Sequence, residues 1–267
     1  MKYRISSPSG RPVPLVLSIP HCGTVFPGEL IDQYNPDLIA FPDDTDWHQD
    51  RLYDFAAARG ITTISAVYSR WVIDLNRSPD QKPLYSDGRI ATDLCPVTTF
   101  LGEPLYRDQR KAVDASEVER RRREYFDPYH ARLSSLLETM VDNFGKVLLW
   151  DCHSIRQFVP TIRAERFPDL ILGSADRVSA HPALIESALS SLGESGLTVQ
   201  HNDPFKGGYI TRHYANPSAG VHALQLEMVK TNYMDESETE FHVSRAAKMA
   251  EHLDKTLSRL LEVLNSL

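Results

Sequence analysis

The chain has 267 residues, a formal net charge of −7 at pH 7 and a pI near 5.8. A nucleic-acid-binding protein needs a basic face, so this charge balance argues against that class. No segment reaches the roughly 18 apolar residues of a membrane-spanning helix, and residues 1–4 do not begin an apolar signal-peptide core. Three cysteines, an odd number in a long chain, do not suggest a disulfide framework. The expected compartment is therefore the cytoplasm.

The first hundred residues alternate strand and helix signals. The apolar run at 15–19 predicts a buried strand, which ends just before His21. Residues 47–59 predict a helix that Thr45 or Asp46 caps and Gly60 closes. Two more predicted strands and an irregular, potentially functional loop follow at 61–67, 70–75 and 79–104.

The rest of the chain continues this alternation. A long helical pattern covers 108–144, where Pro128 is expected to kink or divide the helix. Ser237 and Glu240 offer a capping box to the final helix. The other predicted elements are strands at 147–150, 170–173, 197–201 and 221–228, and helices at 182–192 and 237–267. The pattern predicts one α/β domain over 1–267, with a mixed, mostly parallel sheet flanked by helices.

Two histidines follow predicted buried strands, His21 after 15–19 and His153 after 147–150. Ligands bind at the carboxyl ends of strands in an open α/β sheet, so these imidazoles are expected to share a metal ion. Hydrolytic zinc sites frequently add a carboxylate and keep one position for water. Candidates for that carboxylate are Asp43, Asp44, Asp46 and Asp50. Asp151, beside His153, is a candidate to orient an imidazole.

Other polar residues suggest catalysis and substrate binding. Glu227 lies within an apolar predicted strand, where it is either an outward-facing residue or a general base whose pKa is raised by desolvation. Asn76 and Arg77 end the predicted 70–75 strand, and the guanidinium fork matches a carboxylate. Arg212 is a second candidate, expected on a glycine-rich loop. A surface salt bridge remains the alternative for either arginine.

Five motifs in chain order carry a resemblance to a known family. They are Ser18-Ile-Pro-His21-Cys-Gly23, Asp44-Thr-Asp46-Trp-His48, Tyr68-Ser-Arg-Trp-Val-Ile-Asp74-Leu-Asn-Arg77, Asp151-Cys-His-Ser154 and Leu226-Glu227-Met228. Together they resemble the N-formylglutamate amidohydrolases, also called N-formylglutamate deformylases. That family is similar in its α/β architecture to the zinc carboxypeptidases and aspartoacylases. The motifs span most of the chain, and the Asp-Leu-Asn-Arg and Asp-Cys-His-Ser strings are the most specific.

The resemblance implies metal-dependent hydrolysis of N-formyl-L-glutamate to formate and L-glutamate, in histidine degradation. By position, it implies that His21 and His153 bind one divalent metal, with zinc expected, and that Glu227 is catalytic. Zinc carboxypeptidases place a glutamate three residues after the first histidine, where this chain has Thr24. The carboxylate ligand must therefore come from elsewhere, and Asp46 is the preferred candidate. The candidate substrate-binding residues are Arg70, Asn76, Arg77 and Arg212.

Two other functions stay open at this point. A related amidohydrolase would act on another N-acyl amino acid or a short peptide with the same metal. A non-catalytic binder of acidic small molecules would keep Asn76 and Arg77 without the metal. In each case the expected partner is a small acidic molecule, with no nucleic acid and no membrane. Bound zinc separates enzyme from binder, and relative rates on N-formyl-, N-acetyl- and N-formimino-glutamate separate the enzymes.

Overall fold

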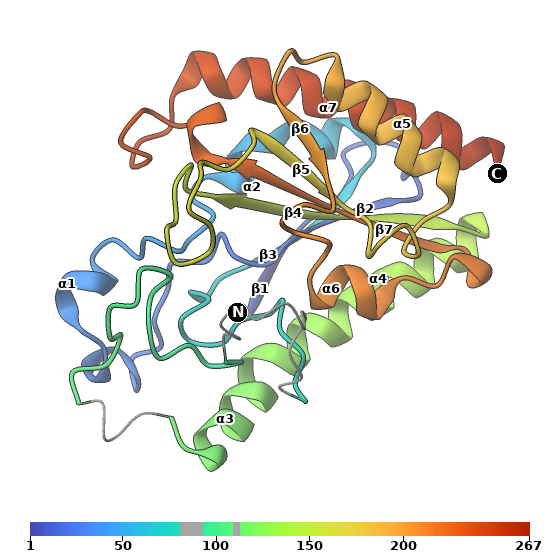
Figure 1. The fold of residues 1–267 in the computed structure, drawn as a ribbon. Helices are drawn as coiled ribbons and strands as arrows, with labels where there is room; N and C mark the ends of the chain where they lie inside the picture. Colours follow the sequence, from blue (N-terminus) through green and yellow to red (C-terminus); the bar gives the residue numbers. More distant parts are fainter. Residues whose placement is uncertain (81–92, 109–112) are drawn as a thin grey trace.

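A seven-stranded sheet with helices on both faces forms the centre of the protein (Figure 1). The computed structural model describes residues 1–80, 93–108 and 113–267. Four of the six strand pairs are parallel, and the pairs β1–β3 and β5–β7 are antiparallel. The strands in spatial order are β1 (Tyr3–Ser6), β3 (Thr62–Ala66), β2 (Leu15–Ile19), β4 (Val147–Ile155), β7 (Val221–Val229), β5 (Leu170–Gly173) and β6 (Val199–His201). The predicted mixed, mostly parallel α/β sheet is confirmed.

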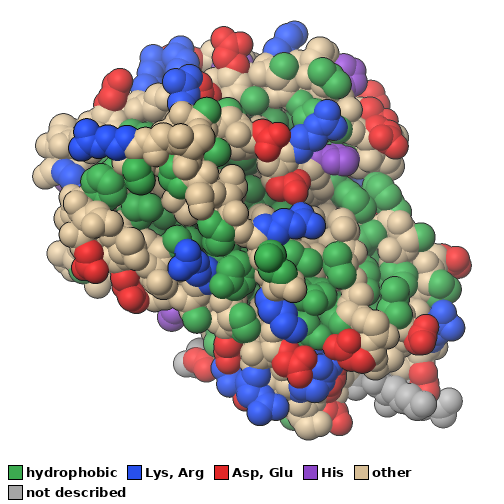
Figure 2. Space-filling view, turned by 180° about the vertical axis from the view of Figure 1, so that it is seen from behind, with side chains coloured by type: hydrophobic (Ala, Val, Ile, Leu, Met, Phe, Trp, Pro, Cys, Tyr) green, Lys and Arg blue, Asp and Glu red, His purple; other side chains and the backbone are tan. Residues whose placement is uncertain are grey.

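Helices α5 and α7 cover one face of the sheet, and α4 and α6 cover the other (Figure 1). The α-helices are α1 (Pro36–Ile39), α2 (Gln49–Leu52), α3 (Ala115–Arg121), α4 (Asp127–Phe144), α5 (Pro182–Gly193), α6 (Tyr209–Tyr214) and α7 (Val243–Ser266). Short 3-10 helices are Ile31–Gln33, Asp54–Arg59, Pro217–Ala219 and Lys230–Asn232. Within the described residues, no helix is long and apolar enough to span a membrane. Acidic and basic side chains are interspersed on the surface seen in Figure 2.

Strand alternation decides which side chains of β4 and β7 reach the functional side of the sheet. Successive side chains of a strand point to opposite faces. Alternate residues pack against α5 and α7, namely Leu148, Trp150 and Cys152 of β4 with Leu224 and Leu226 of β7. The intervening positions begin with the apolar residues Leu149 and Ala223, which pack on the α4 side. The same face then turns polar toward the carboxyl ends, with Asp151 and His153 in β4 and Gln225 and Glu227 in β7.

Two predictions in the first hundred residues are wrong. Residues 70–75 form turns instead of a strand, because the N–H groups of Trp71 and Val72 both bond back to Ser69. The helix predicted at 47–59 is broken into α2 and the 3-10 helix Asp54–Arg59. Its N-cap is His48, at a left-handed φ of 61°, rather than Thr45 or Asp46. Gly60 does end the segment, with a φ of 80°.

Helix ends differ from expectation where local hydrogen bonds compete. The long helix begins at Ala115, where the side chain of Asp114 caps it, and residues 109–112 lie outside the described part. A π-helical turn at Arg122–Phe126 directly precedes Pro128, which sits in the first turn of α4, so the helix changes type where the proline was expected to disturb it. The capping box proposed at Ser237 does not form. Helix α7 starts six residues later behind His242, because Asp235 takes the N–H groups of Thr239 and Glu240.

The remaining predicted elements are confirmed with small shifts. The strands at 15–19 and 170–173 match β2 and β5 residue for residue. The strand predicted at 147–150 continues to Ile155, so His153 is part of β4 instead of following it. Of the irregular segment at 79–104, residues 81–92 lie outside the described part, and the rest holds no helix or strand. The edge strand β1 has no counterpart among the predictions, because its alternating burial leaves only a short, half-exposed pattern.

Candidate metal centre and catalytic cavity

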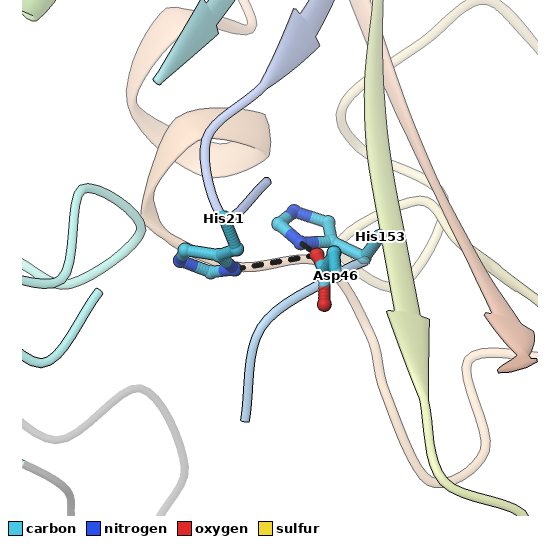
Figure 3. Close-up of side chains that lie close together, drawn as sticks. All are labelled: His21, Asp46 and His153. Carbon is cyan, nitrogen blue, oxygen red and sulfur yellow. Dashed lines mark hydrogen bonds and ion pairs between the residues drawn. The ribbon is translucent and has the colours of Figure 1, made fainter. Parts of the chain in front are cut away.

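His21, Asp46 and His153 meet at the carboxyl edge of the sheet (Figure 3). His21 follows β2, His153 belongs to β4, and Asp46 lies in the turn before α2. A backbone hydrogen bond of 3.0 Å from the N–H of Asp46 to the carbonyl of His21 joins the first two segments. Oδ2 of Asp46 lies 3.6 Å from Nδ1 of His21 and 3.3 Å from Nδ1 of His153. All three side chains are buried, so the expected grouping of two histidines with Asp46 is present in the structure.

Each imidazole of this group has a carboxylate behind it. Nε2 of His21 lies 2.7 Å from Oδ1 of Asp74, and Nε2 of His153 lies 3.1 Å from Oδ2 of Asp151. Metal-binding histidines commonly donate their second ring N–H to a carboxylate, which fixes the tautomer and leaves the other nitrogen free to bind metal. Both Nδ1 atoms then face the centre of the group. Asp151 therefore has the orienting position that the sequence suggested, and Asp74 has the equivalent position for His21.

Unpaired polar atoms at the centre show that a cation fits there. Nδ1 of His21 and Oδ1 of Asp46 are buried and have no hydrogen-bond partner among the described residues. Buried polar atoms are nearly always paired, so such atoms in a dry site call for an additional group. Burial by itself would raise the pKa of Asp46, but its contacts with His153 and His21 lower it overall. The carboxyl is therefore ionised, and two nitrogens and one oxygen form a donor set that suits a divalent metal.

Of the four acidic candidates, Asp46 is the one that joins the two histidines in the described part of the chain. Asp43 instead pairs with Arg156 at 2.8 Å, and Asp50 is exposed. Asp44 accepts hydrogen bonds from the indole of Trp71 and the N–H of Phe100. The structure therefore groups with the histidines the acid that the sequence analysis preferred, and distant partners occupy Asp43 and Asp44.

A cavity of roughly 210 Å³ opens beside the centre. Its lining includes the three members of the His–Asp–His group and five further polar side chains: Arg70, Asn76, Arg77, Gln225 and Glu227. Glu227 stands beside His153 in the β4–β7 register and is 9% exposed. Burial raises the pKa of Glu227 to about 8, although the nearby His153 opposes the shift. The structure thus excludes the outward-facing interpretation of Glu227 and leaves a carboxyl that exchanges protons near neutral pH.

Two arginines place positive charge in this cavity. Arg70 is buried, donates to Oδ2 of Asp74 at 2.7 Å and lies over the ring of Phe100 at 4.7 Å. Arg77 is a quarter exposed and has Asp74 at 4.0 Å. Burial opposes the ionisation of Asp74, but Arg70 and His21 outweigh it and hold its pKa well below the usual range. Asp74 therefore anchors both arginines and one histidine, a role that the sequence analysis missed although the acid lies between two arginines in one motif.

The two remaining substrate-binding candidates differ in their placement. Asn76 lines the cavity, but its amide is already engaged: Oδ1 accepts from the N–H of Ile210 at 2.7 Å, and Nδ2 donates to Oδ2 of Asp151 at 3.3 Å. Arg212 lies in helix α6, not on a loop as expected, and donates to the carbonyl of Gly207 at 2.8 Å. It is not among the described residues that line the cavity. The structure thus brings Arg70, Asn76 and Arg77 to the centre and leaves Arg212 outside.

One cavity of this α/β fold brings together a buried His–Asp–His group that could hold a metal ion, a glutamate with a raised pKa and two arginines, a set of groups suited to a hydrolase. The family model for N-formylglutamate amidohydrolase matches residues 13–234. The chain belongs to this family, and the resemblance seen in the five sequence motifs is confirmed.

Known proteins agree with this assignment along nearly the whole chain. The N-formylglutamate deformylases of Pseudomonas putida and Pseudomonas aeruginosa are 38% and 42% identical to it, over 94% of this chain and 92% of theirs. The crystal structure of an N-formylglutamate amidohydrolase from Ralstonia eutropha JMP134 is similar, with a TM-score of 0.79 and 26% identity over 99% of this chain and 98% of that one. A protein from Agrobacterium tumefaciens shares the fold, with a TM-score of 0.73 at 18% identity over 96% of this chain and 95% of that one.

Proposed function

We propose that this protein hydrolyses N-formyl-L-glutamate to formate and L-glutamate, as a single catalytic domain holding one divalent metal. Zinc is the expected ion, with His21, Asp46 and His153 as its ligands. The observation that carries the proposal is the cavity, which joins a buried donor set for a cation to Glu227 and two arginines. The curated relatives at 38% and 42% identity bear the name N-formylglutamate deformylase, which supports this substrate.

The residues of the cavity divide the chemistry of amide hydrolysis among them. A divalent metal at this centre supplies Lewis acidity, which polarises a carbonyl oxygen and makes water more acidic. Glu227 accepts a proton from the attacking water and later delivers it to the nitrogen of the leaving L-glutamate, while the carbon–nitrogen bond breaks. The burial that raises the pKa of Glu227 suits both transfers, because a carboxyl shifted toward the working pH can accept and release a proton.

Substrate charge is matched by the arginines. N-formyl-L-glutamate carries two carboxylates, and Arg70 and Arg77 place two guanidinium groups in the cavity. The more open Arg77 is suited to a carboxylate that enters from solvent, since its fork binds both oxygens at once. Holding the substrate at these points fixes the formyl group against the reacting residues, which removes much of the entropic barrier.

The three cysteines are free, which supports the cytoplasm as the proposed site of action.

The test combines metal content with product release. The purified protein should contain about one divalent metal per chain and release L-glutamate from N-formyl-L-glutamate, together with formate, faster than from the N-formimino analogue (with formamide) or the N-acetyl analogue (with acetate). His21→Ala and His153→Ala should each lose the metal and nearly all activity while remaining folded. His252→Ala, in α7 and away from the cavity, is the matched control. Stoichiometric metal in both cavity variants, or no formate from the metal-loaded wild type, would contradict the proposal.

A further inference from the structure

Gln225 occupies the inner end of the cavity on the same strand as Glu227. The two residues are two positions apart on β7, so their side chains share one face, and both line the cavity. Gln225 lies about 6–7 Å further from the carboxyl edge of the sheet, the spacing of two strand residues. In the register with β4 it stands beside Asp151, one step behind the level of His153 and Glu227. It is 4% exposed.

The oxygen of the Gln225 carboxamide is held in place by the backbone. Oε1 accepts a hydrogen bond of 2.8 Å from the N–H of Gly208. Gly208 lies against the side chain of Asn76, so closely that a Cβ at this position would lie only 2.4 Å from Nδ2 of Asn76. Asn76 in turn accepts the N–H groups of Tyr209 and Ile210 at the start of α6. Since a backbone N–H requires an acceptor, these contacts fix which end of the amide faces Gly208.

The other end of this amide has no partner within the described part of the chain. No hydrogen bond of the Gln225 amino group is formed with any described residue, although the side chain is more than nine-tenths buried. An amide amino group has two donors and no acceptor capacity. Asn76, the other amide in the cavity, already has partners for both its oxygen and its nitrogen, the N–H of Ile210 and Oδ2 of Asp151. Gln225 therefore presents a neutral donor, accessible from the cavity and without a partner among the described residues, to whatever fills the inner end.

We propose that Gln225 is a specificity-determining residue that donates a hydrogen bond to the side-chain carboxylate of the substrate. The inference rests on the proposed function, in which the formyl group lies at the level of His153 and Glu227. The substrate group that reaches the level of Gln225, two strand residues deeper than Glu227, is then not the formyl group but another part of the substrate. Arg77 lies on the more exposed side, so the carboxylate on Cα faces Arg77 and the glutamyl side chain extends to Gln225.

A hydrogen-bond donor in this position favours substrates that carry an acceptor and also disfavours substrates that lack one. A substrate whose side chain carries an acceptor satisfies the amide after water has left the cavity. An apolar side chain of similar length displaces the same water and leaves the donor unpaired, which is the arrangement that gives binding sites their strongest discrimination. Gln225 thus separates N-formylglutamate from formylated apolar amino acids that present the same formyl group and the same carboxylate on Cα.

The experiment compares two substrates in two variants. Gln225→Met keeps the length of the side chain and removes the donor. It should lower kcat/KM for N-formyl-L-glutamate by about ten- to a hundred-fold, the range for a lost hydrogen bond to a charged group. For N-formyl-L-norleucine kcat/KM should not fall and should rise by up to about ten-fold, because no donor is left unpaired; the change is measured as an inhibition constant if this compound is not turned over. Gln200→Met, the same change at an exposed position of β6, should leave both substrates unaffected.

A second variant separates the donor from the contact with Gly208. Gln225→Glu keeps an acceptor for the Gly208 N–H and places a carboxylate oxygen where the amino group was. It should disfavour N-formyl-L-glutamate at least as strongly as Gln225→Met does. Equal losses on both substrates in Gln225→Met, or wild-type selectivity in Gln225→Glu, would overturn the proposal. Metal content and unfolding temperature of each variant show that the centre and the fold are intact.

The proposed reaction and the role of Gln225 can fail separately. Formate release by the metal-loaded wild type tests the reaction alone. Calorimetric binding of N-formyl-L-glutamate to wild type and to Gln225→Met tests the hydrogen bond whether or not turnover occurs, with an affinity about ten-fold or more weaker expected for the variant. Equal affinities would show that Gln225 does not contact this ligand.

Discussion

Replacing Asp74 by asparagine tests how the metal centre is held. Asp74 is buried and uses one oxygen for Nε2 of His21 and the other for Nη2 of Arg70, each at 2.7 Å. Asparagine has nearly the same shape but only one acceptor and no charge. If its amino group faces His21, the imidazole must carry its proton on Nδ1, the nitrogen that points at Asp46. A protonated nitrogen cannot bind a metal ion. The substitution should therefore weaken metal binding although Asp74 is not itself a proposed ligand.

The expected loss has two parts. Orienting carboxylates behind metal-binding histidines contribute about 10- to 100-fold in metal affinity, so the Kd for zinc should rise by that factor. This corresponds to about 1.4–2.8 kcal/mol. If the amide faces His21 with its oxygen instead, Arg70 loses its partner. Breaking a buried ion pair costs about 3–5 kcal/mol of stability, and both side chains are at most 7% exposed. The fall in stability and the fall in affinity therefore depend on which way the amide turns.

Competition with a chromogenic chelator gives the zinc affinity, and urea unfolding of the metal-free protein gives the stability. The matched control is Asp127→Asn, whose carboxylate pairs with Arg122 at the surface, away from the cavity. That variant should lose less than about 1 kcal/mol and keep its zinc affinity. An Asp74→Asn protein with wild-type zinc affinity and wild-type stability would refute the reasoning, because no amide orientation both leaves Nδ1 of His21 free for a metal and keeps an acceptor for Arg70.

Three further predictions follow from the same geometry. Glu227→Gln should retain metal and fold but lower kcat for formate release by about 10²–10⁴-fold, and an unchanged kcat would make Glu227 structural. Arg77→Lys should lose part of about 2–5 kcal/mol in kcat/KM for N-formyl-L-glutamate, and much less for the analogue amidated on its Cα carboxylate; equal losses would make Arg77 a scaffold residue. Burial lowers the pKa of His130 to about 3 from an ordinary 6.5, so the folded state keeps it neutral while the unfolded state binds a proton. Stability should therefore fall by about 1.4 kcal/mol per pH unit as the pH drops from 6.5 toward 3. Urea unfolding of His130→Gln at pH 5 and 7 should show a shallower dependence, and an unchanged slope would assign the acid sensitivity to other groups.

Much of the sheet and two members of the metal centre were predictable from local sequence. Central parallel strands are buried on both faces, so they require unbroken apolar runs, and such runs locate β2 and β5 to the residue. The same rule placed His21 and His153 at one edge, because parallel strands end on the same side of the sheet. Glu227 was identifiable as an acid in an apolar strand, although its sequence position left open which way it points.

Tertiary structure decided the features that depend on partners far along the chain. Residues 70–75 carry strand-like apolar residues, yet they turn, and Asp74, which also holds Arg70, bonds to His21 from 53 positions away. Asp46 joins the histidines, whereas Asp43 is paired with Arg156 and Asp44 accepts a hydrogen bond from the indole of Trp71. Arg212 stays outside the cavity, because helix α6 directs its guanidinium to Gly207. Apolar burial follows a periodic pattern that a short window of sequence reveals, whereas a buried polar group is placed by the particular partner that compensates its desolvation, and only the folded chain supplies that partner.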